Sequence, residues 1–406
     1  MKPPRWIAAA FFIVVASAFS MGGCAEDAKD CPTPQPIGDL EAVGSDACRS
    51  CHDNDDSRLG VWDDFMNSGH PHKLNAVING EKPDDPTLEL PDDLSPAGIA
   101  WGDVAYVIGG YGWKARFILK TGKPGNIHTG NIAQYNLDPP SGASPWVAYE
   151  ASNPDKPYTC GTCHATGWLT YAENGNVHQD GLAGIMGTWD EPGIRCERCH
   201  GPGSRHVASG GDPTLININR SSDLCGECHM RDPNHKPLAK GGFIEHHEQY
   251  DEMLSAGHAA SLCTTCHDPH RGVKKDDPDG SGIRVACETC HADEAAHLSH
   301  IPGPRCIDCH MPYVSKTAVA HNVYKADLRT HIFKIRATTD TRQTMFVTEG
   351  SETFVPHGYG VTLDFVCYQC HKDEQQVGGS ASVKSMAELA ARARGIHSNK
   401  AFATVD

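Results

Sequence analysis

The chain has 406 residues and a formal net charge of −16, with 18 cysteines and 24 histidines. This acidic balance argues against nucleic-acid binding, because contact with phosphates needs a basic patch. With 41 glycines and 27 prolines, the side chains alone cannot build a large apolar core.

The first residues have the pattern of an export signal. Lys2 and Arg5 form a basic start, and residues 7–19 form a short apolar run. Such a run is typical of a secretory signal peptide and is too short for a comfortable membrane span. We therefore predict a signal peptide over residues 1–23 and an exported protein, in the periplasm or at the outer surface.

The residues at the end of the signal peptide indicate whether the chain is anchored to a membrane. Residues 21–23 before Cys24 resemble a bacterial lipobox, in which the cysteine becomes the lipidated first residue. The alternative is cleavage after Ala18, which leaves Cys24 and Cys31 free to form a disulfide. A lipid at Cys24 would be the chain's only membrane anchor, and Ala25 favours the outer membrane.

The next segments differ in composition. Residues 24–47 are rich in Pro, Asp and Glu and are predicted to be a tether. Residues 48–98 hold the first Cys-x-x-Cys-His motif, and residues 99–150 hold none. Within the latter, the apolar runs 104–108 and 113–119 are separated by glycines, which predicts a small β-hairpin near 100–120.

The remaining chain is dominated by the same motif. Residues 151–310 contain six copies and form the predicted core, and residues 311–380 contain the last copy. In residues 381–406, apolar residues recur at helical spacing, which predicts a C-terminal amphipathic helix. A packing role for this helix is favoured over a partner-binding role.

The Cys-x-x-Cys-His motif carries the chemistry. Two thiols can add to the vinyl groups of one haem while the adjoining imidazole binds the iron, so we predict eight covalently bound haem c groups. A zinc site or a disulfide framework is the alternative, but zinc does not need a histidine directly after every cysteine pair. The cysteines are Cys48, Cys51, Cys160, Cys163, Cys196, Cys199, Cys225, Cys228, Cys263, Cys266, Cys287, Cys290, Cys306, Cys309, Cys367 and Cys370, and the histidines are His52, His164, His200, His229, His267, His291, His310 and His371.

Sixteen further histidines lie outside the motifs, so the supply permits a second histidine at every iron. A histidine a few residues after a motif lies on the proximal side of its own haem, so His206 and His270 should bind neighbouring haems. The predicted distal ligands are His70, His178, His206, His247, His258, His270, His300 and His331. The reserves are His72, His246, His297, His321 and His357, and the predicted surface residues are His128, His235 and His397.

These features predict a mostly irregular fold, in which short α-helices and loops wrap round a stacked haem core. Burial of the metal and its macrocycle replaces burial of side chains, so folding should depend on haem insertion.

Several stretches resemble multihaem c-type cytochromes of metal-reducing bacteria and the related tetrahaem cytochromes of nitrifiers. The resemblance covers most of residues 48–371, and His128 departs from it. It implies bis-histidine haems in close stacked pairs and little regular structure. The stretches are Val107–Gly110 with Trp113–Phe117, Gln179–Leu182 with Cys196–Ser204, Gly241–Ile244 with His247–Tyr250 and Cys263–His270, and Cys306–Pro312 with Arg329–His331.

Two functions follow from this resemblance. The favoured one is an electron carrier without catalytic residues, passing electrons from periplasmic donors to another redox protein or an extracellular acceptor. Some relatives form filaments, and the surplus histidines leave room for contacts with other copies of the chain. The alternative is a reductase of nitrite, hydroxylamine or a sulfur oxyanion with one open haem. No motif ends in Lys, which counts against the reductase.

Overall fold

The structure is a computed structural model that describes residues 40–53, 60–255, 257–273, 280, 282–298, 300 and 303–397. The predicted signal peptide and lipobox, with Cys24 and Cys31, lie outside these residues, as does most of the tether. Among the helices described, none is long and apolar enough to cross a bilayer.

The helices are short, and most of the haem motifs lie on them. Cysteines three residues apart share one face of a helical turn, so a motif on a helix presents both thiols in the same direction. The α-helices are α1 (Ser45–His52), α2 (Trp62–Met66), α3 (Gly161–His164), α4 (Cys196–His200), α5 (Ser204–Ala208), α6 (Ser222–His229), α7 (Gln249–Leu254), α8 (Cys263–Cys266), α9 (Ala292–Ala296), α10 (Cys306–His310), α11 (Arg342–Met345), α12 (Leu363–Cys367) and α13 (Met386–Ala393).

The strands form two larger sheets and several two-stranded pairs. They are β1 (Leu74–Ala76), β2 (Val104–Gly109), β3 (Lys114–Leu119), β4 (Gly130–Asn136), β5 (Trp146–Tyr149), β6 (Ala165–Thr166), β7 (Leu169–Thr170), β8 (Gly187–Thr188), β9 (Glu191–Pro192), β10 (Ala239–Lys240), β11 (Phe243–Glu245), β12 (Ser315–Asn322), β13 (Lys325–Leu328), β14 (Ile335–Arg336), β15 (Val347–Glu349), β16 (Glu352–Phe354) and β17 (Val361–Thr362). The pairs are β6–β9, β7–β8, β14–β17 and β15–β16. Short helices and small sheets confirm the predicted, mostly irregular fold.

The motif-free segment forms an antiparallel sheet in the order β1-β2-β3-β4-β5. The predicted hairpin is its centre, where β2 pairs with β3 and Ile108 lies opposite Arg116. Gly109 makes the turn with φ of +77°, and a Cβ there would lie 2.6 Å from the Lys114 carbonyl oxygen. The sheet is larger than the predicted hairpin because β1, β4 and β5 join it through pairing across loops, which local periodicity does not report.

The second sheet has the order β10-β11-β12-β13, with β11 and β12 parallel. It packs on an apolar cluster that includes Phe243, Ile244 and Phe365. The two sheets meet at β3, where Trp113 Nε1 donates to the Asp327 carbonyl oxygen at 2.9 Å and Lys114 Nζ donates to the Thr317 carbonyl oxygen.

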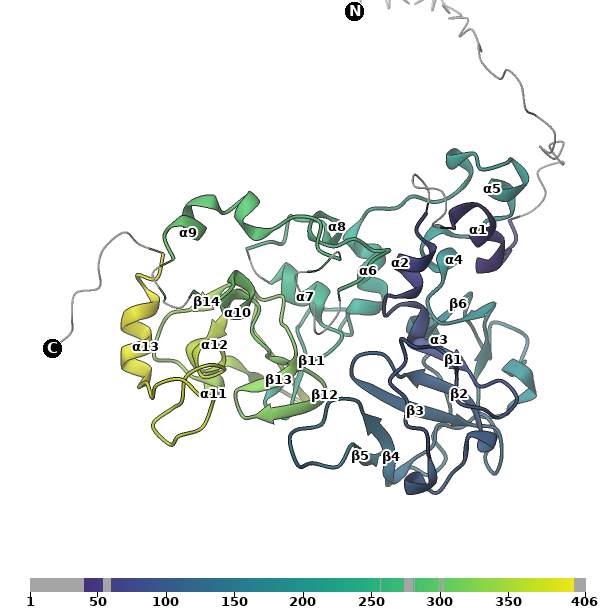
Figure 1. Cartoon of the computed structure of the whole chain (residues 1–406), viewed down its shortest axis with the longest axis horizontal. Helices are drawn as coiled ribbons and strands as arrows, with labels where there is room; N and C mark the ends of the chain where they lie inside the picture. The colour runs from purple at the N-terminus through teal and green to yellow at the C-terminus, as the bar shows by residue number, and fades with distance from the viewer. Residues whose placement is uncertain are drawn as a thin grey trace, which may run out of the picture.

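The elements follow one another across an elongated molecule (Figure 1). The first sheet lies at one end below α1 and α4, helices α6 to α8 occupy the middle, and α13 lies at the far end. The motif helices therefore run along the length of the molecule, above both sheets.

Candidate haem sites and a cationic cluster

Seven of the eight motif histidines face the ring of a histidine from elsewhere in the chain. Each pair has a ring-centroid separation between 5.9 and 6.4 Å. The pairs are His52–His206, His229–His70, His200–His270, His291–His258, His267–His331, His371–His300 and His310–His397.

This spacing fits an iron between the rings. A metal–imidazole bond is about 2.0 Å, so two bonds and two ring radii of about 1.1 Å span about 6 Å. None of the sixteen cysteines in the described ranges is in a disulfide, so every motif keeps its thiols for the vinyl groups. The residues present therefore fit haem at these motifs.

Hydrogen bonds at Nδ1 orient several motif histidines so that Nε2 is available to bind iron. Nδ1 of His200, His310 and His371 lies 2.8, 2.8 and 3.0 Å from the carbonyl oxygens of Asn217, Phe333 and Ser382. A backbone carbonyl at Nδ1 fixes the proton there and leaves Nε2 basic for a metal.

The same bond occurs on one predicted distal residue, where Nδ1 of His206 lies 2.9 Å from the Asp212 carbonyl oxygen. His206 faces His52, the histidine of the first motif, at 6.4 Å. The prediction that His206 and His270 serve motifs other than the ones they follow agrees with their placement, since His270 faces His200.

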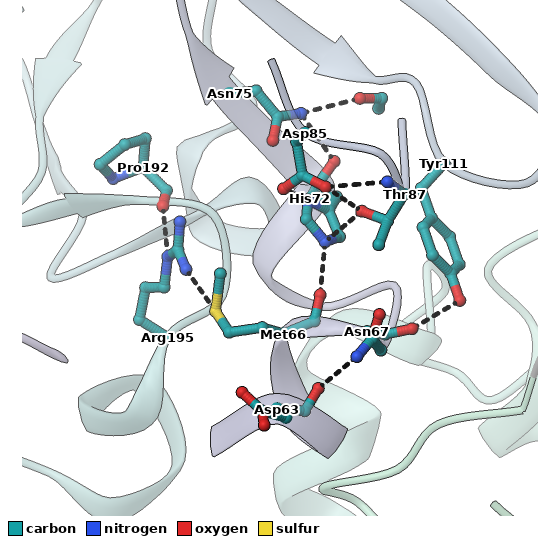
Figure 2. A network of polar contacts seen from close by, with 11 residues as sticks. Asp63, Met66, Asn67, His72, Asn75, Asp85, Thr87, Tyr111, Pro192 and Arg195 are labelled. Carbon is teal, nitrogen blue, oxygen red and sulfur yellow. Dashed lines mark hydrogen bonds and ion pairs between the residues drawn. The ribbon is translucent and has the colours of Figure 1, made fainter. Parts of the chain in front are cut away.

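Other histidines have Nε2 occupied by a protein group. The buried His72 has Nε2 2.7 Å from the Met66 carbonyl oxygen and 3.0 Å from Thr87 Oγ1, in the network of Figure 2. Nε2 of His128 lies 3.0 Å from the Ala97 carbonyl oxygen. In both rings Nε2 is therefore used to hold the fold at residues 66–128.

Three further histidines are either bonded to other protein groups or exposed. Nε2 of His357 lies 2.9 Å from the His235 carbonyl oxygen, and Nδ1 of His235 lies 2.9 Å from Asp251 Oδ1. His321 is exposed on β12. None of the three faces a motif histidine within the described residues.

Two predicted ligands differ from the others in their placement. His178 stacks on Tyr171 with centroids 4.4 Å apart, and its Nδ1 lies 2.7 Å from the Ile185 carbonyl oxygen. His247 has its ring centroid 3.5 Å from that of His246. Among the described residues, neither is paired with a motif histidine, whereas the exposed His397 is. Sequence spacing alone could not separate these cases, because His178 and His247 lie about as near to a motif in the sequence as His70 and His331 do.

His164, in the second motif, is the exception among the motif histidines. Its Nδ1 lies 2.9 Å from the Lys73 carbonyl oxygen, so its ring is turned as the others are. No histidine ring among the described residues faces it at the pair distance. Burial lowers the pKa of His164 to about 4, and the charges of Lys73, Arg116 and Lys114 act in the same direction.

The groups round His164 form a cationic cluster, which we define as Lys73, Lys114, Arg116 and Arg231. The charges of three of these groups act on one another: burial lowers the pKa of Lys114 to about 7, and the charges of Arg116 and Arg231 also lower it. The whole chain is strongly acidic, so this cluster of positive charges is opposite in sign to the chain's net charge. It marks a place that attracts anions.

The first sheet positions two members of the cluster. Lys114 and Arg116 are two residues apart on β3 and so share one face of the strand. Arg116 Nε donates to Gln134 Oε1 at 2.8 Å, and its guanidinium lies over the Tyr149 ring at 3.7 Å. Two charged residues inside an otherwise apolar strand are the signal in the sequence that could have indicated this site.

The other side of the cluster comes from the middle of the chain. Arg231 follows α6, and its Nη2 lies 3.2 Å from Nδ1 of His247, which lies between β11 and α7. Burial lowers the pKa of His247 to about 2, and the charges of Arg231 and His164 contribute to this shift. The charged groups near His164 and His247 therefore come from β3, from the end of α6 and from two loops.

The motifs also contact one another in a definite order. Helix α1 lies against α4, α3 against α6, α6 against α8, and α10 against α12. The thiols of Cys48 and Cys196 contact each other, as do those of Cys163 and Cys228 and those of Cys225 and Cys263.

Further contacts extend this order. Arg198 of the third motif pairs with Glu227 of the fourth at 2.7 Å. Cys306 Sγ of the seventh motif lies 3.6 Å from Glu288 Oε1 of the sixth. The thiol of Cys266 is near enough to the sixth motif for the charge of Cys287 to act on it. The contacts trace the order first, third, fourth, fifth, sixth, seventh and eighth, with the second motif attached beside the fourth.

Comparisons with known proteins agree with these sites. Residues 143–201 match the family model "Cytochrome c554 and c-prime". A segment of 154 residues is 26% identical to the multiheme cytochrome MtrA of Shewanella baltica. That match covers 34% of this chain and 41% of the relative, so the chain matches less than half of that protein's length.

Two solved structures are similar in fold. The octaheme sulfite reductase MccA of Wolinella succinogenes superposes with a TM-score of 0.53 at 18% identity, over 89% of this chain and 68% of that one. The outer cell wall cytochrome OcwA gives a TM-score of 0.44 at 19% identity, over 73% and 80% of the two chains. At such identities the first likeness shows the fold alone. The repeated attachment motifs, the matched segment and this fold are all similar to those of multihaem c-type cytochromes.

Proposed function

We propose that this protein is an octahaem reductase of a small anion, in which seven motifs conduct electrons and the second motif holds the substrate site. The single observation that carries this proposal is the exception at His164. Seven motif histidines face another histidine ring, whereas no such ring faces His164 among the described residues, and the charges of Lys73, Arg116 and Lys114 act on it. The sequence favoured an electron carrier over a reductase, whereas the placement of His164 favours the reductase.

Haem bound at these motifs would supply iron that cycles between ferric and ferrous states, and an iron with a free face would bind a ligand. The chain's own residues decide which face stays free. Histidines from other segments approach the motif histidines in pairs, including His70 at His229 and His331 at His267. Near His164 lie the cations Lys73, Arg116 and Lys114, together with His247 beside Arg231.

The cationic cluster supports an anionic substrate. Lys114 and Arg116 extend from a rigid strand, and Arg231 is steadied by His247 at 3.2 Å. Fixed donors of this kind bind an oxyanion and stabilise charge that develops on its oxygens. Nitrite and the sulfur oxyanions belong to this class.

Reduction of an oxyanion consumes protons as well as electrons. Lys114 and His247 are both near enough to His164 for their charges to interact with it. Both have pKa values lowered by burial, Lys114 to about 7. An ammonium with a pKa near neutrality gives up a proton more readily than an ordinary lysine. We assign proton delivery to Lys114 and anion binding to Arg116 and Arg231.

The order of the motifs supports delivery of electrons to this site. The second motif touches the fourth through Cys163 and Cys228, and the fourth lies inside the series that runs between the two ends. Cys51 in the first motif and Cys370 in the eighth are exposed. A redox partner can therefore approach either end, which also suits the electron-carrier function.

The spin state of the iron tests the substrate site. In the oxidised protein we expect one high-spin ferric signal by electron paramagnetic resonance beside the low-spin majority. Adding nitrite or sulfite should change that high-spin signal and leave the low-spin signals as they are. Hydroxylamine, which is uncharged, shows whether the change requires an anion. A spectrum with only low-spin signals, unchanged by the anions, would contradict the reductase and favour the electron carrier.

The haem count is tested by mass. We expect the purified protein to exceed the mass of its processed chain by eight haems, because each motif presents two free thiols and a histidine. Replacing both cysteines of one motif by alanine is the matched comparison and should lower the count by one. A wild-type mass with fewer haems would show that a motif is not used.

Localisation is tested at the predicted lipobox. We propose an exported protein that is anchored by a lipid on Cys24 and meets its redox partners outside the cytoplasm. Cys24→Ser should move the haem protein from the membrane fraction to the soluble fraction, and Cys31→Ser should leave it in place. A wild-type protein that is already soluble would instead favour cleavage after Ala18.

A further inference from the structure

The segment that follows α13 reaches back to the seventh motif. His397 lies four residues beyond Ala393, the last residue of the helix, and its ring stacks on His310 with centroids 6.0 Å apart and planes 27° apart. This separation lies within the range of the other six pairs. His397 is nevertheless exposed, and the sequence placed it among the surface residues.

The ring of His397 is held as a ligand's ring would be. Its Nδ1 lies 3.0 Å from the Glu294 carbonyl oxygen in α9. That bond leaves Nε2 as the nitrogen free to bind a metal. On the opposite side, Nδ1 of His310 is held by the Phe333 carbonyl oxygen at 2.8 Å. Both rings are therefore anchored by backbone carbonyls.

The other histidines near this motif have different neighbours. His258 faces His291 of the sixth motif at 5.9 Å and contacts Phe333 at 4.3 Å. His297 directly follows α9 and is half-buried, with its Nδ1 2.6 Å from the Asp293 carbonyl oxygen. His397 is thus the histidine that the described structure places opposite His310.

Helix α13 holds this segment by a small contact. Ser385 and Glu388 form a capping box that starts the helix, and Leu389 and Ala390 are its buried residues. They pack against Leu363 and Tyr368, next to the eighth motif. Elements with few buried apolar contacts open locally at a lower free energy than the core of a protein.

We propose that His397 is the distal axial ligand of the seventh haem and that α13, with the segment after it, is a detachable arm that carries this ligand. The arm connects three motifs: Nδ1 of His397 bonds to α9 beside the sixth, its ring faces the seventh, and α13 packs beside the eighth. Opening of the arm would free one face of the seventh haem while the covalent attachment at Cys306 and Cys309 remains. This inference does not depend on the substrate site at the second motif.

The test uses the full chain with its haems attached and compares two alanine variants. His397→Ala should add one high-spin ferric signal to whatever the wild type shows, and ferrous protein should bind one more carbon monoxide. His297→Ala, which removes another histidine beside the sixth motif, should change neither. A His397→Ala protein identical to the wild type, or a new signal in His297→Ala, would overturn the assignment.

A methionine variant separates ligation from folding. His397→Met keeps a sixth ligand but replaces imidazole with a thioether, which raises the reduction potential. We expect one haem of the variant to titrate at a higher potential, with all others unchanged. An unaltered titration would show that residue 397 does not touch the iron. Failure of the reductase proposal would appear in the wild type, whereas failure of this inference appears only in the variants.

A third variant tests the arm itself. Leu389→Ala removes a buried contact of α13 and leaves His397 intact. We expect carbon monoxide to bind the ferrous seventh haem faster than in the wild type, because the arm opens more often. Binding at the wild-type rate would mean that α13 does not control access.

Discussion

Replacing Lys114 by methionine is expected to lower anion reduction by about 10²- to 10³-fold, the usual cost of removing one fixed charge or donor from a reaction site. Methionine keeps most of the length of the side chain but removes its charge and proton. The thiols and histidines of all eight motifs are untouched, so the haem count and the low-spin signals should stay as in the wild type. The measurement is steady-state reduction of nitrite or sulfite with an artificial electron donor.

The matched control is Lys120→Met, because Lys120 is an exposed lysine just after the same strand. It should keep wild-type turnover. Lys114→Arg should retain anion binding but lose turnover, since arginine holds its proton permanently. Wild-type turnover in Lys114→Met would contradict the role given to the cationic cluster.

Removing the second haem should separate catalysis from conduction. In a Cys160→Ala/Cys163→Ala protein we expect one haem fewer and no turnover of the anion. Electron exchange between the two ends should persist, because the contacts place the second motif beside the fourth and outside the series that joins the ends. Haem mass, turnover and stopped-flow reduction of the remaining haems measure these three properties.

The comparison variant removes a haem inside the series. Cys263→Ala/Cys266→Ala also lacks one haem, but at the fifth motif, which contacts the fourth through Cys225. It should show biphasic reduction, because the haems on the two sides of the gap no longer exchange electrons rapidly. Turnover that survives loss of the second haem would place the substrate site elsewhere.

The parts of the fold that depend on local spacing were predictable. The hairpin at β2 and β3 has apolar β-branched residues on both sides of glycines, and α13 has apolar residues at helical spacing. Both are present. The three strands that enlarge the hairpin were not predicted, because their partners are chosen by pairing across loops.

The distal histidines, too, were only partly predictable from the sequence. Six of the predicted ligands face motif histidines, but His178 stacks on Tyr171 and His247 contacts Arg231. His397 was predicted to be a surface residue, whereas its ring faces His310. A carbonyl at Nδ1 leaves Nε2 for a metal, but His178 also has this bond, so only the ring that lies opposite a motif histidine separates the two groups.

The sequence by itself determined the cofactor. Covalent attachment needs two thiols and a histidine at fixed local spacing, so eight motifs can be read without a structure. Only the tertiary structure decided which histidines meet, the order of the motifs and the exception at His164. These depend on contacts between segments as far apart as Lys73, Lys114 and Arg231, and the charges of a chain that is acidic as a whole gave no sign that these cations converge.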